Sequence, residues 1–240
     1  MFRLRVAPST LARSNNTLLK PHTLPRPFIT GLPVATARRF DSTTTQPKIS
    51  DRIKHDHKEL EDCYNAIITS KDPAQQVRFQ NLFVWELARH SIAEEIVVYP
   101  AFEKYIPDGK LMADKDRAEH LEVKELLYDF QNMTPEDPAF ITTLQSLWSS
   151  LSKHIKEEER QDLPALEKHI DSDVSMSMAN SFQKTKHFVP TRSHPSAPDK
   201  PPYETAVGLL TTPMDKLMDM FKTFPKDEER PNPPGARPPA

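Results

Sequence analysis

The chain has 240 residues, 37% of them hydrophobic, and its 32 basic and 34 acidic side chains give a formal net charge of −2. Its 4 glycines and the scarcity of alternating β-branched residues argue against a β-sheet protein, and 24 prolines leave room for one domain of modest size rather than two. The single cysteine, Cys63, excludes an intramolecular disulfide, a cysteine-ligated zinc site and an iron–sulfur cluster.

Residues 1–40 differ in composition from the rest of the chain. They contain seven basic residues and no acidic residue, and serine and threonine are frequent. This composition is typical of a mitochondrial presequence, and Arg38-Arg39-Phe40 resembles the site of a matrix protease. We therefore expect cleavage soon after Phe40 and a location in the mitochondrial matrix, with a disordered basic tail as the alternative.

Removal of this segment changes the charge balance. The rest of the chain has 25 of the 32 basic residues and all 34 acidic ones, which gives a net charge of −9. Such a charge disfavours nucleic acid and anionic lipid as partners. The apolar runs of the segment are too short for a secretory signal or a transmembrane helix. We therefore expect no transmembrane segment.

Amphipathic helical patterns cover four segments in the middle of the chain, residues 49–70, 73–105, 111–131 and 138–170. Asp72-Pro73 is a typical N-cap and first-turn proline for the second segment. The proline-rich connection 134–138 separates the third segment from the fourth. Four helices with short connections predict an all-α fold, an up-down-up-down four-helix bundle over residues 49–170.

The remainder of the chain, residues 171–240, is rich in proline. Twelve of the 24 prolines lie between Pro190 and Pro239, which predicts a largely disordered or extended tail. An amphipathic pattern at 214–224 interrupts the tail and predicts a short helix. This helix either docks back on the bundle or binds a protein partner.

The four helical segments contain an internal repeat. The motif His90-x-x-x-Glu94-Glu95 returns 64 residues later as His154-x-x-x-Glu158-Glu159. A shorter match upstream pairs residues 56–60 with residues 119–123, and its histidines are His57 and His120. The repeating unit is therefore a pair of helices, which predicts a bundle with internal two-fold symmetry.

Six ionisable residues fall on the inward faces of these helices: His57, His90, Glu94, His120, His154 and Glu158. A histidine and a glutamate four residues apart share one helical face. Burying such groups is costly unless they are paired, hydrogen-bonded or ligated, so the set predicts a metal site. Without thiolates it suits iron, manganese or zinc, and two carboxylates between paired metals best match a di-iron centre.

The order His, HxxxE, His, HxxxE over four helices resembles the hemerythrin-like, or HHE cation-binding, domain, and the match spans about residues 49–170. The resemblance implies a non-haem di-iron site with two iron ions per chain, in which Glu94 and Glu158 bridge and the four histidines ligate. The oxygen carriers of this family have a fifth histidine, four residues from its partner on the third helix. The positions four residues from His120 are Asp116 and Lys124, so that ligand is absent.

The absent fifth histidine disfavours reversible oxygen transport. An open position at the iron would take water or a carboxylate from Asp116, Glu95 or Glu159. Glu95 and Glu159 are turned away from their HxxxE neighbours and are expected to support the site or to be solvated, while the charge of Lys124 opposes a second cation.

Two classes of function follow from the resemblance. The first is a non-catalytic protein that binds O2 or NO, or that buffers or senses iron in oxidative or nitrosative stress. The alternative is a di-iron enzyme that acts on peroxide or reduces nitric oxide. The glycine-rich loops of nucleotide and flavin binding are missing, and no motif separates the two classes.

Overall fold

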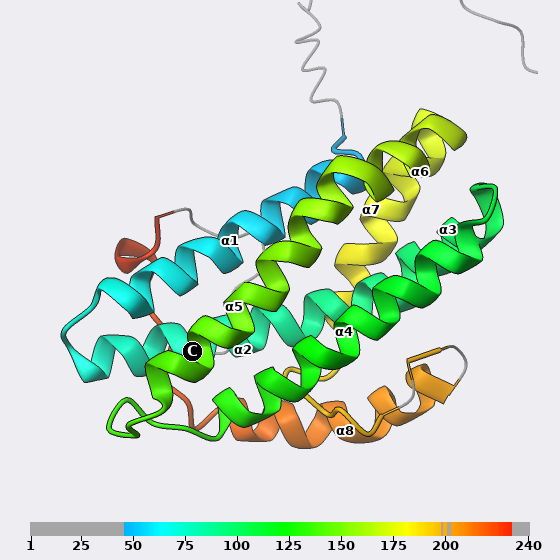
Figure 1. Ribbon diagram of the computed structural model, residues 1–240. Helices are drawn as coiled ribbons and strands as arrows, with labels where there is room; N and C mark the ends of the chain where they lie inside the picture. Colours follow the sequence, from blue (N-terminus) through cyan, green and yellow to red (C-terminus); the bar gives the residue numbers. More distant parts are fainter. Residues whose placement is uncertain (1–45, 198, 201–202, 232–240) are drawn as a thin grey trace, which may run out of the picture. The chain divides into compact units, whose positions relative to one another are not determined.

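The computed structural model describes residues 46–197, 199–200 and 203–231, and every regular element within these ranges is helical (Figure 1). The long helices of the predicted segments are α1 (Ile49–Thr69), α2 (Pro73–Ala93), α4 (Gly109–Gln131) and α5 (Phe140–Glu157). The others are α3 (Tyr99–Tyr105), α6 (Leu163–His169), α7 (Ser172–Lys186), α8 (Tyr203–Asp219) and the short η3 (Asp227–Glu229). The all-α class is confirmed for this part of the chain, whereas the predicted presequence, residues 1–40, lies outside it.

The long helices run side by side, as Figure 1 shows. α1 packs against α2, α4 packs against α5, and α1 also contacts α5. At the start of α2 the Asp72 side chain accepts a hydrogen bond from the Ala74 N–H at 3.0 Å, and Pro73 occupies the first turn, where no helical N–H bond is lost. Within the described ranges, no helix combines the length and the apolar character needed to cross a membrane.

Two apolar clusters fill the interior and leave a polar layer between them. The first cluster includes Leu60, Leu87, Val123 and Leu151. The second includes Ile53, Ala93, Ala113 and Leu163. Each long helix carries one of the histidines His57, His90, His120 and His154. Along the chain, each histidine has a residue of one cluster before it and a residue of the other cluster after it. The four histidines therefore meet in a layer that is closed on both sides by apolar side chains.

Each HxxxE motif crosses from an α-helix into one π-helical turn. The first turn is η1 (Glu94–Val98) and the second is η2 (Glu158–Asp162), and Pro100 and Pro164 follow them in the next helices. Proline has no N–H for the α-helical bond and its ring crowds the preceding turn, which favours a change of winding there. Each π turn begins with the glutamate of its motif, at equivalent positions in the two copies of the repeat.

Helix α7 lies where the sequence predicts the start of a largely disordered tail. Its Met178 and Phe182 are buried in the second apolar cluster, so the expected disorder from residue 171 is wrong for this segment. The buried positions of α7 are Ser175, Met178, Ala179, Phe182 and Lys186, which have helical spacing. The proline content of the later tail obscured this pattern.

The helix predicted at 214–224 is displaced toward the N-terminus. α8 spans Tyr203–Asp219, contains Pro213, and ends before Phe224. Phe224 packs edge to face against Trp85 of α2, with ring centroids 6.3 Å apart. This part of the tail therefore contacts the long helices.

Gly109 begins α4 where that helix passes close to the end of α3. A Cβ atom at Gly109 would overlap the backbone carbonyl group of Phe102, and a backbone group cannot turn aside as a flexible side chain does. We therefore expect Gly109→Ala to lower the free energy of unfolding in urea by about 1–3 kcal/mol. The control is Lys110→Ala at the next, exposed position, where a change below about 0.5 kcal/mol is expected. Equal effects at the two positions would contradict the steric explanation.

Candidate metal centre

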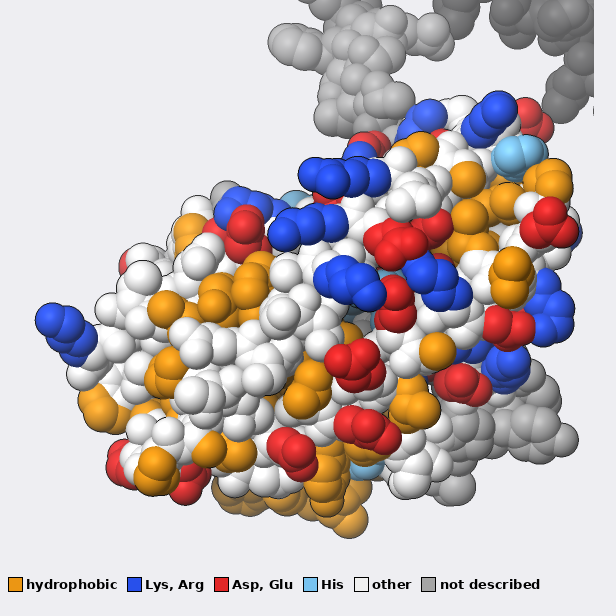
Figure 2. Space-filling model, viewed as in Figure 1, with side chains coloured by type: hydrophobic (Ala, Val, Ile, Leu, Met, Phe, Trp, Pro, Cys, Tyr) orange, Lys and Arg blue, Asp and Glu red, His pale blue; other side chains and the backbone are white. Residues whose placement is uncertain are grey.

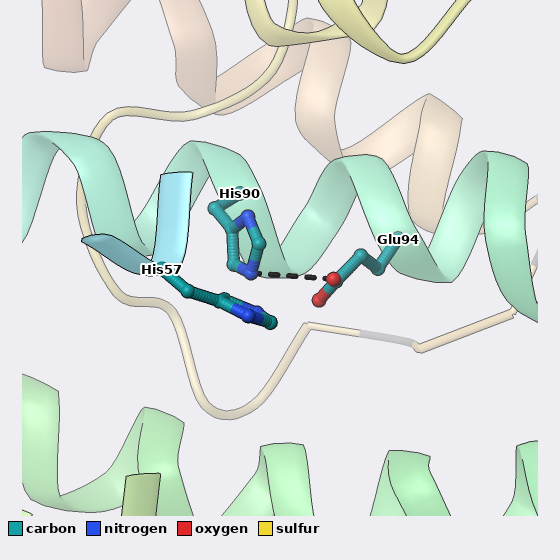
Figure 3. A group of neighbouring side chains, drawn as sticks. All are labelled: His57, His90 and Glu94. Carbon is teal, nitrogen blue, oxygen red and sulfur yellow. Dashed lines mark ion pairs between the residues drawn. The ribbon is translucent and has the colours of Figure 1, made fainter. Parts of the chain in front are cut away.

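The six inward residues of the sequence pattern converge in the polar layer. His57 comes from α1, His90 from α2, His120 from α4, His154 from α5, and Glu94 and Glu158 begin the two π turns. None of the six is more than 3% exposed. Ligand atoms of His57, His90 and Glu94 lie within 4.8 Å of one another (Figure 3). The same holds for Glu94, His120 and His154, so Glu94 belongs to both groups.

The two oxygens of Glu94 face imidazoles from opposite halves of the repeat. Glu94 Oε1 lies 3.2 Å from His90 Nε2, and Glu94 Oε2 lies 3.4 Å from His120 Nε2. Glu158 Oε2 lies 3.3 Å from His57 Nε2. Glu94 thus stands between the two histidine pairs, where a bridging carboxylate would be.

These contacts between the inward atoms are close, yet they lack hydrogen-bond geometry. His57 Nε2 and all four carboxylate oxygens of Glu94 and Glu158 are buried without a hydrogen-bond partner. A buried polar group without a partner costs about 1–3 kcal/mol, so a cluster of them indicates a further partner. Imidazole nitrogens and carboxylate oxygens around one small volume fit metal cations.

Each of the four histidines also has a carboxylate at its other ring nitrogen. The Nδ1 distances are 2.9 Å for His57 to Glu159, 3.3 Å for His90 to Asp56, 3.1 Å for His120 to Glu95 and 2.9 Å for His154 to Glu119. A carboxylate that accepts the Nδ1 proton fixes the tautomer and leaves Nε2 free to ligate, as in most metal-binding histidines. The outer carboxylates thus orient all four rings toward the interior.

Asp56 and Glu119 were not among the residues predicted for the site. Each directly precedes the first histidine of its repeat, His57 or His120, and each serves the histidine of the following helix. Their equivalent positions in the two copies of the repeat were the available sequence signal. The sequence does not predict which helix these carboxylates contact, because the contact depends on how neighbouring helices are rotated about their axes.

Two of the four outer carboxylates are buried together with a lysine. Lys124 Nζ lies 2.5 Å from Glu95 Oε2, and Lys186 Nζ of α7 lies 2.5 Å from Asp56 Oδ2. Burial alone would raise the pKa of Asp56, but the charge of Lys186 and the contacts with two histidines hold it well below its ordinary value. The charge of Lys124, predicted to oppose a second cation, is compensated by Glu95. Glu119 and Glu159 are instead partly exposed.

Asp116 lies next to His154, at one end of the site. Its ligand oxygen lies within 4.8 Å of ligand atoms of Glu119 and His154, the residue is 1% exposed, and Oδ2 has no hydrogen-bond partner. Burial and the nearby Asp162 raise the pKa of Asp116 to about 7. Tyr99 approaches the same end and its hydroxyl lies 2.8 Å from His120 Nε2.

The central carboxylates differ sharply in their affinity for protons. Burial and the adjacent Glu158 raise the pKa of Glu94 well above its ordinary value. Burial also acts to raise the pKa of Glu158, but the contact with His57 and the surrounding imidazoles lower it to about 2. Two facing carboxylates in an apolar interior cannot both ionise unless a cation lies between them. A bound metal would therefore replace the proton of Glu94.

Comparison with known proteins shows the family to which the chain belongs. The family model of the hemerythrin HHE cation-binding domain matches residues 48–166. A hemerythrin-like protein of Schizosaccharomyces pombe is 55% identical over 179 residues, which are 74% of this chain and 88% of that protein. The chain therefore belongs to the hemerythrin HHE cation-binding family.

Two more distant proteins are also similar. A DNA nickase of Nostoc sp. is 25% identical over 144 residues, which are 60% of this chain and 40% of the nickase. The crystal structure of a hemerythrin HHE cation-binding domain-containing protein from Mycobacterium kansasii is 19% identical, with a TM-score of 0.49, and the match covers 59% of this chain and 88% of that one.

Proposed function

We propose that the chain holds two iron ions between its four long helices, which form an up-down-up-down bundle with an internal two-fold repeat. The ligands are Nε2 of His57, His90, His120 and His154 and the carboxylates of Glu94 and Glu158. The observation that carries this proposal is the position of Glu94, whose two oxygens face His90 and His120 at 3.2 and 3.4 Å. Iron, when bound, supplies affinity for diatomic ligands and one-electron chemistry.

The residues of the chain prepare the centre for this role. Glu94 would give up its proton to a bound cation, and an outer carboxylate at each Nδ1 orients the ring so that Nε2 faces the cation. Lys124 and Lys186 balance the charge of the two buried outer carboxylates. The apolar clusters on either side keep bulk water away from the layer.

The proposed role of the loaded protein is to bind O2 or NO, or to buffer or sense iron in oxidative or nitrosative stress, without catalysis. In support, the buried carboxylate of Asp116 lies beside Glu119 and His154, so that groups suited to holding iron extend to this end of the site. The test is titration of iron-loaded protein with dioxygen, nitric oxide and peroxide, followed by the optical spectrum. Saturable binding of nitric oxide without its consumption is expected, and dioxygen should give only a short-lived complex. Sustained turnover of any of the three ligands would contradict a non-catalytic role.

A di-iron enzyme that acts on peroxide or nitric oxide is the second candidate. It is favoured by Tyr99, a buried phenol whose hydroxyl lies 2.8 Å from His120 Nε2 and which is placed to give a proton and an electron to the centre. Tyr99→Phe removes the hydroxyl and keeps the ring. If the enzyme hypothesis holds, peroxide or nitric oxide turnover falls in this variant while iron content is unchanged.

Asp116→His supplies the imidazole that the oxygen carriers of the family have at the third helix. Asp116 lies beside His154, whereas Lys124 is engaged by Glu95, so we expect only Asp116→His to make the bound-oxygen spectrum longer lived. The matched control is Lys124→His, which removes the partner of Glu95 and offers no ligand to the centre. A longer-lived oxygen spectrum in Lys124→His alone would show that the position of the absent ligand was misassigned.

The proposed location is the mitochondrial matrix, on the basis of the basic and acid-free residues 1–40. A fluorescent protein fused after residue 45 tests this. Mitochondrial fluorescence that disappears on removal of residues 2–40 is expected, and a diffuse signal from the intact fusion would contradict it.

A further inference from the structure

A cavity of about 340 Å³ opens between α1 and α5 and reaches the metal centre. His57 and Glu159 form part of its wall. His57 is 3% exposed and belongs to the buried layer, whereas the Glu159 side chain is 34% exposed. The Glu159 carboxylate accepts the hydrogen bond of His57 Nδ1 at 2.9 Å, so it lies between the cavity and a candidate metal ligand. Of the other outer carboxylates, Asp56 and Glu95 are buried and Glu119 is partly exposed.

The cavity is lined by three lysines, Lys54 and Lys58 from α1 and Lys156 from α5. Lys58 is paired with Glu61 and Asp62. Lys54 and Lys156 have no ion pair within the described ranges. Figure 2 shows several Lys and Arg side chains where α1 and α5 run side by side in Figure 1, with Asp, Glu and apolar side chains next to them.

The residues that line the cavity include three lysines and two carboxylates, Glu61 and Glu159, an excess of one positive charge among the lining residues. Glu61 lies 3.0 Å from Lys58, and Glu159 holds His57. Trp148 and Ile155 form the apolar part of the wall, and Trp148 is stacked on Tyr64 with ring centroids 4.6 Å apart. A rigid apolar wall beside unpaired ammonium groups strengthens their field and concentrates anions.

We propose that this cavity is a binding site for small anions, through which an anionic ligand reaches the metal centre at Glu159. The inference rests on the proposed metal centre and adds the class of ligand to it. Lys54 and Lys156 attract the anion, and Trp148 and Ile155 exclude larger hydrated ions from the inner part. At the inner end the anion takes the place of the Glu159 carboxylate, which is free to swing toward solvent because it is partly exposed.

The first test needs no metal, because Trp148 reports on the cavity by its fluorescence. The other tryptophan, Trp85, is 6% exposed and lies under the guanidinium of Arg89. Iodide, an anion, is compared with neutral acrylamide as quencher at low salt. Lys54→Gln/Lys156→Gln should reduce iodide quenching about fivefold, the effect of two unit charges roughly 8 Å away in a watery groove, and leave acrylamide quenching unchanged.

Two controls make this test specific. Lys168→Gln/Lys184→Gln removes the same charge from exposed positions on α6 and α7 and should leave iodide quenching as in the wild type. Trp148→Phe should abolish the part of the emission that iodide quenches. Equal loss of iodide quenching in both lysine pairs, or no loss in Lys54→Gln/Lys156→Gln, would overturn the proposal.

The second test uses iron-loaded protein and sodium azide as the anionic probe, with nitric oxide as the neutral one. The cavity variant should bind azide about fivefold more slowly in a stopped-flow experiment, by the same charge estimate, at unchanged iron content and with an unchanged rate of nitric oxide binding. An unchanged rate of azide binding would refute entry through this cavity. If the protein takes up no metal but iodide quenching behaves as expected, the proposed function fails while the anion site stands.

Discussion

Lys186→Met is expected to lower the free energy of unfolding by about 3–5 kcal/mol, because it leaves a buried carboxylate without its cation. Lys186 lies 2.5 Å from Asp56 and 3.4 Å from Glu86, and Arg89 lies 2.8 Å from Glu86. All four side chains are at most 4% exposed. Two cations and two anions balance in this network, and methionine removes one cation while nearly preserving the volume.

Chemical denaturation of the metal-free protein measures the effect of Lys186→Met without interference from metal binding. Lys184→Met, an exposed lysine two positions earlier on α7, is the matched control and should change stability by less than about 0.5 kcal/mol. Adding Asp56→Asn to Lys186→Met removes the unpaired charge and should restore part of the loss. A loss below about 1 kcal/mol in Lys186→Met would show that the network is hydrated.

Replacing any of His57, His90, His120 and His154 by alanine is expected to abolish stable metal loading. Each removes an Nε2 atom from the polar layer, together with the Nδ1 group that contacts its outer carboxylate. Removing the hydrogen-bond partner of a metal ligand typically lowers metal affinity about 10–100-fold. Removing the ligand itself should lower it further. Metal content after gel filtration against a weak chelator measures the effect.

The controls for the histidine variants are His55→Ala and His169→Ala. The His55 side chain is 43% exposed, and His169 Nδ1 lies 2.8 Å from the backbone carbonyl of Ala165 in its own helix. Neither reaches the polar layer, so both variants should keep their metal. Loss of iron in His55→Ala with full loading in His57→Ala would place the centre on the acidic group of His55, Asp56 and Glu59 instead.

The helices and the inward residues were predictable because both follow from local periodicity. Residues that share a helical face are fixed by 3.6 residues per turn, so the spacing of His90 and Glu94 carries over directly into space. The repeat with an offset of 64 residues indicated that a second, equivalent group exists. That both groups would share Glu94 was not predictable, because the repeat makes Glu94 and Glu158 equivalent.

The rest of the site depends on contacts between helices, which periodicity does not encode. The contact of Asp56 with His90 joins α1 and α2. Lys186, which also contacts Asp56, lies on α7, beyond the expected end of the bundle at residue 170. The π turns at Glu94 and Glu158 could have been suspected from the prolines six residues later. α7 was overlooked because composition was averaged over a tail whose prolines begin only at Pro190.

The metal content of the iron-loaded protein tests the central claim most directly. The chain is loaded anaerobically with ferrous iron, freed of excess metal, and measured for iron and zinc per chain by elemental analysis. Zinc must be controlled, because the same ligands bind it more tightly than ferrous iron. Two metal ligand groups that share Glu94 predict about two iron ions per chain, one for each group. A stoichiometry of one, or uptake of zinc in place of iron at equal supply, would contradict the di-iron centre.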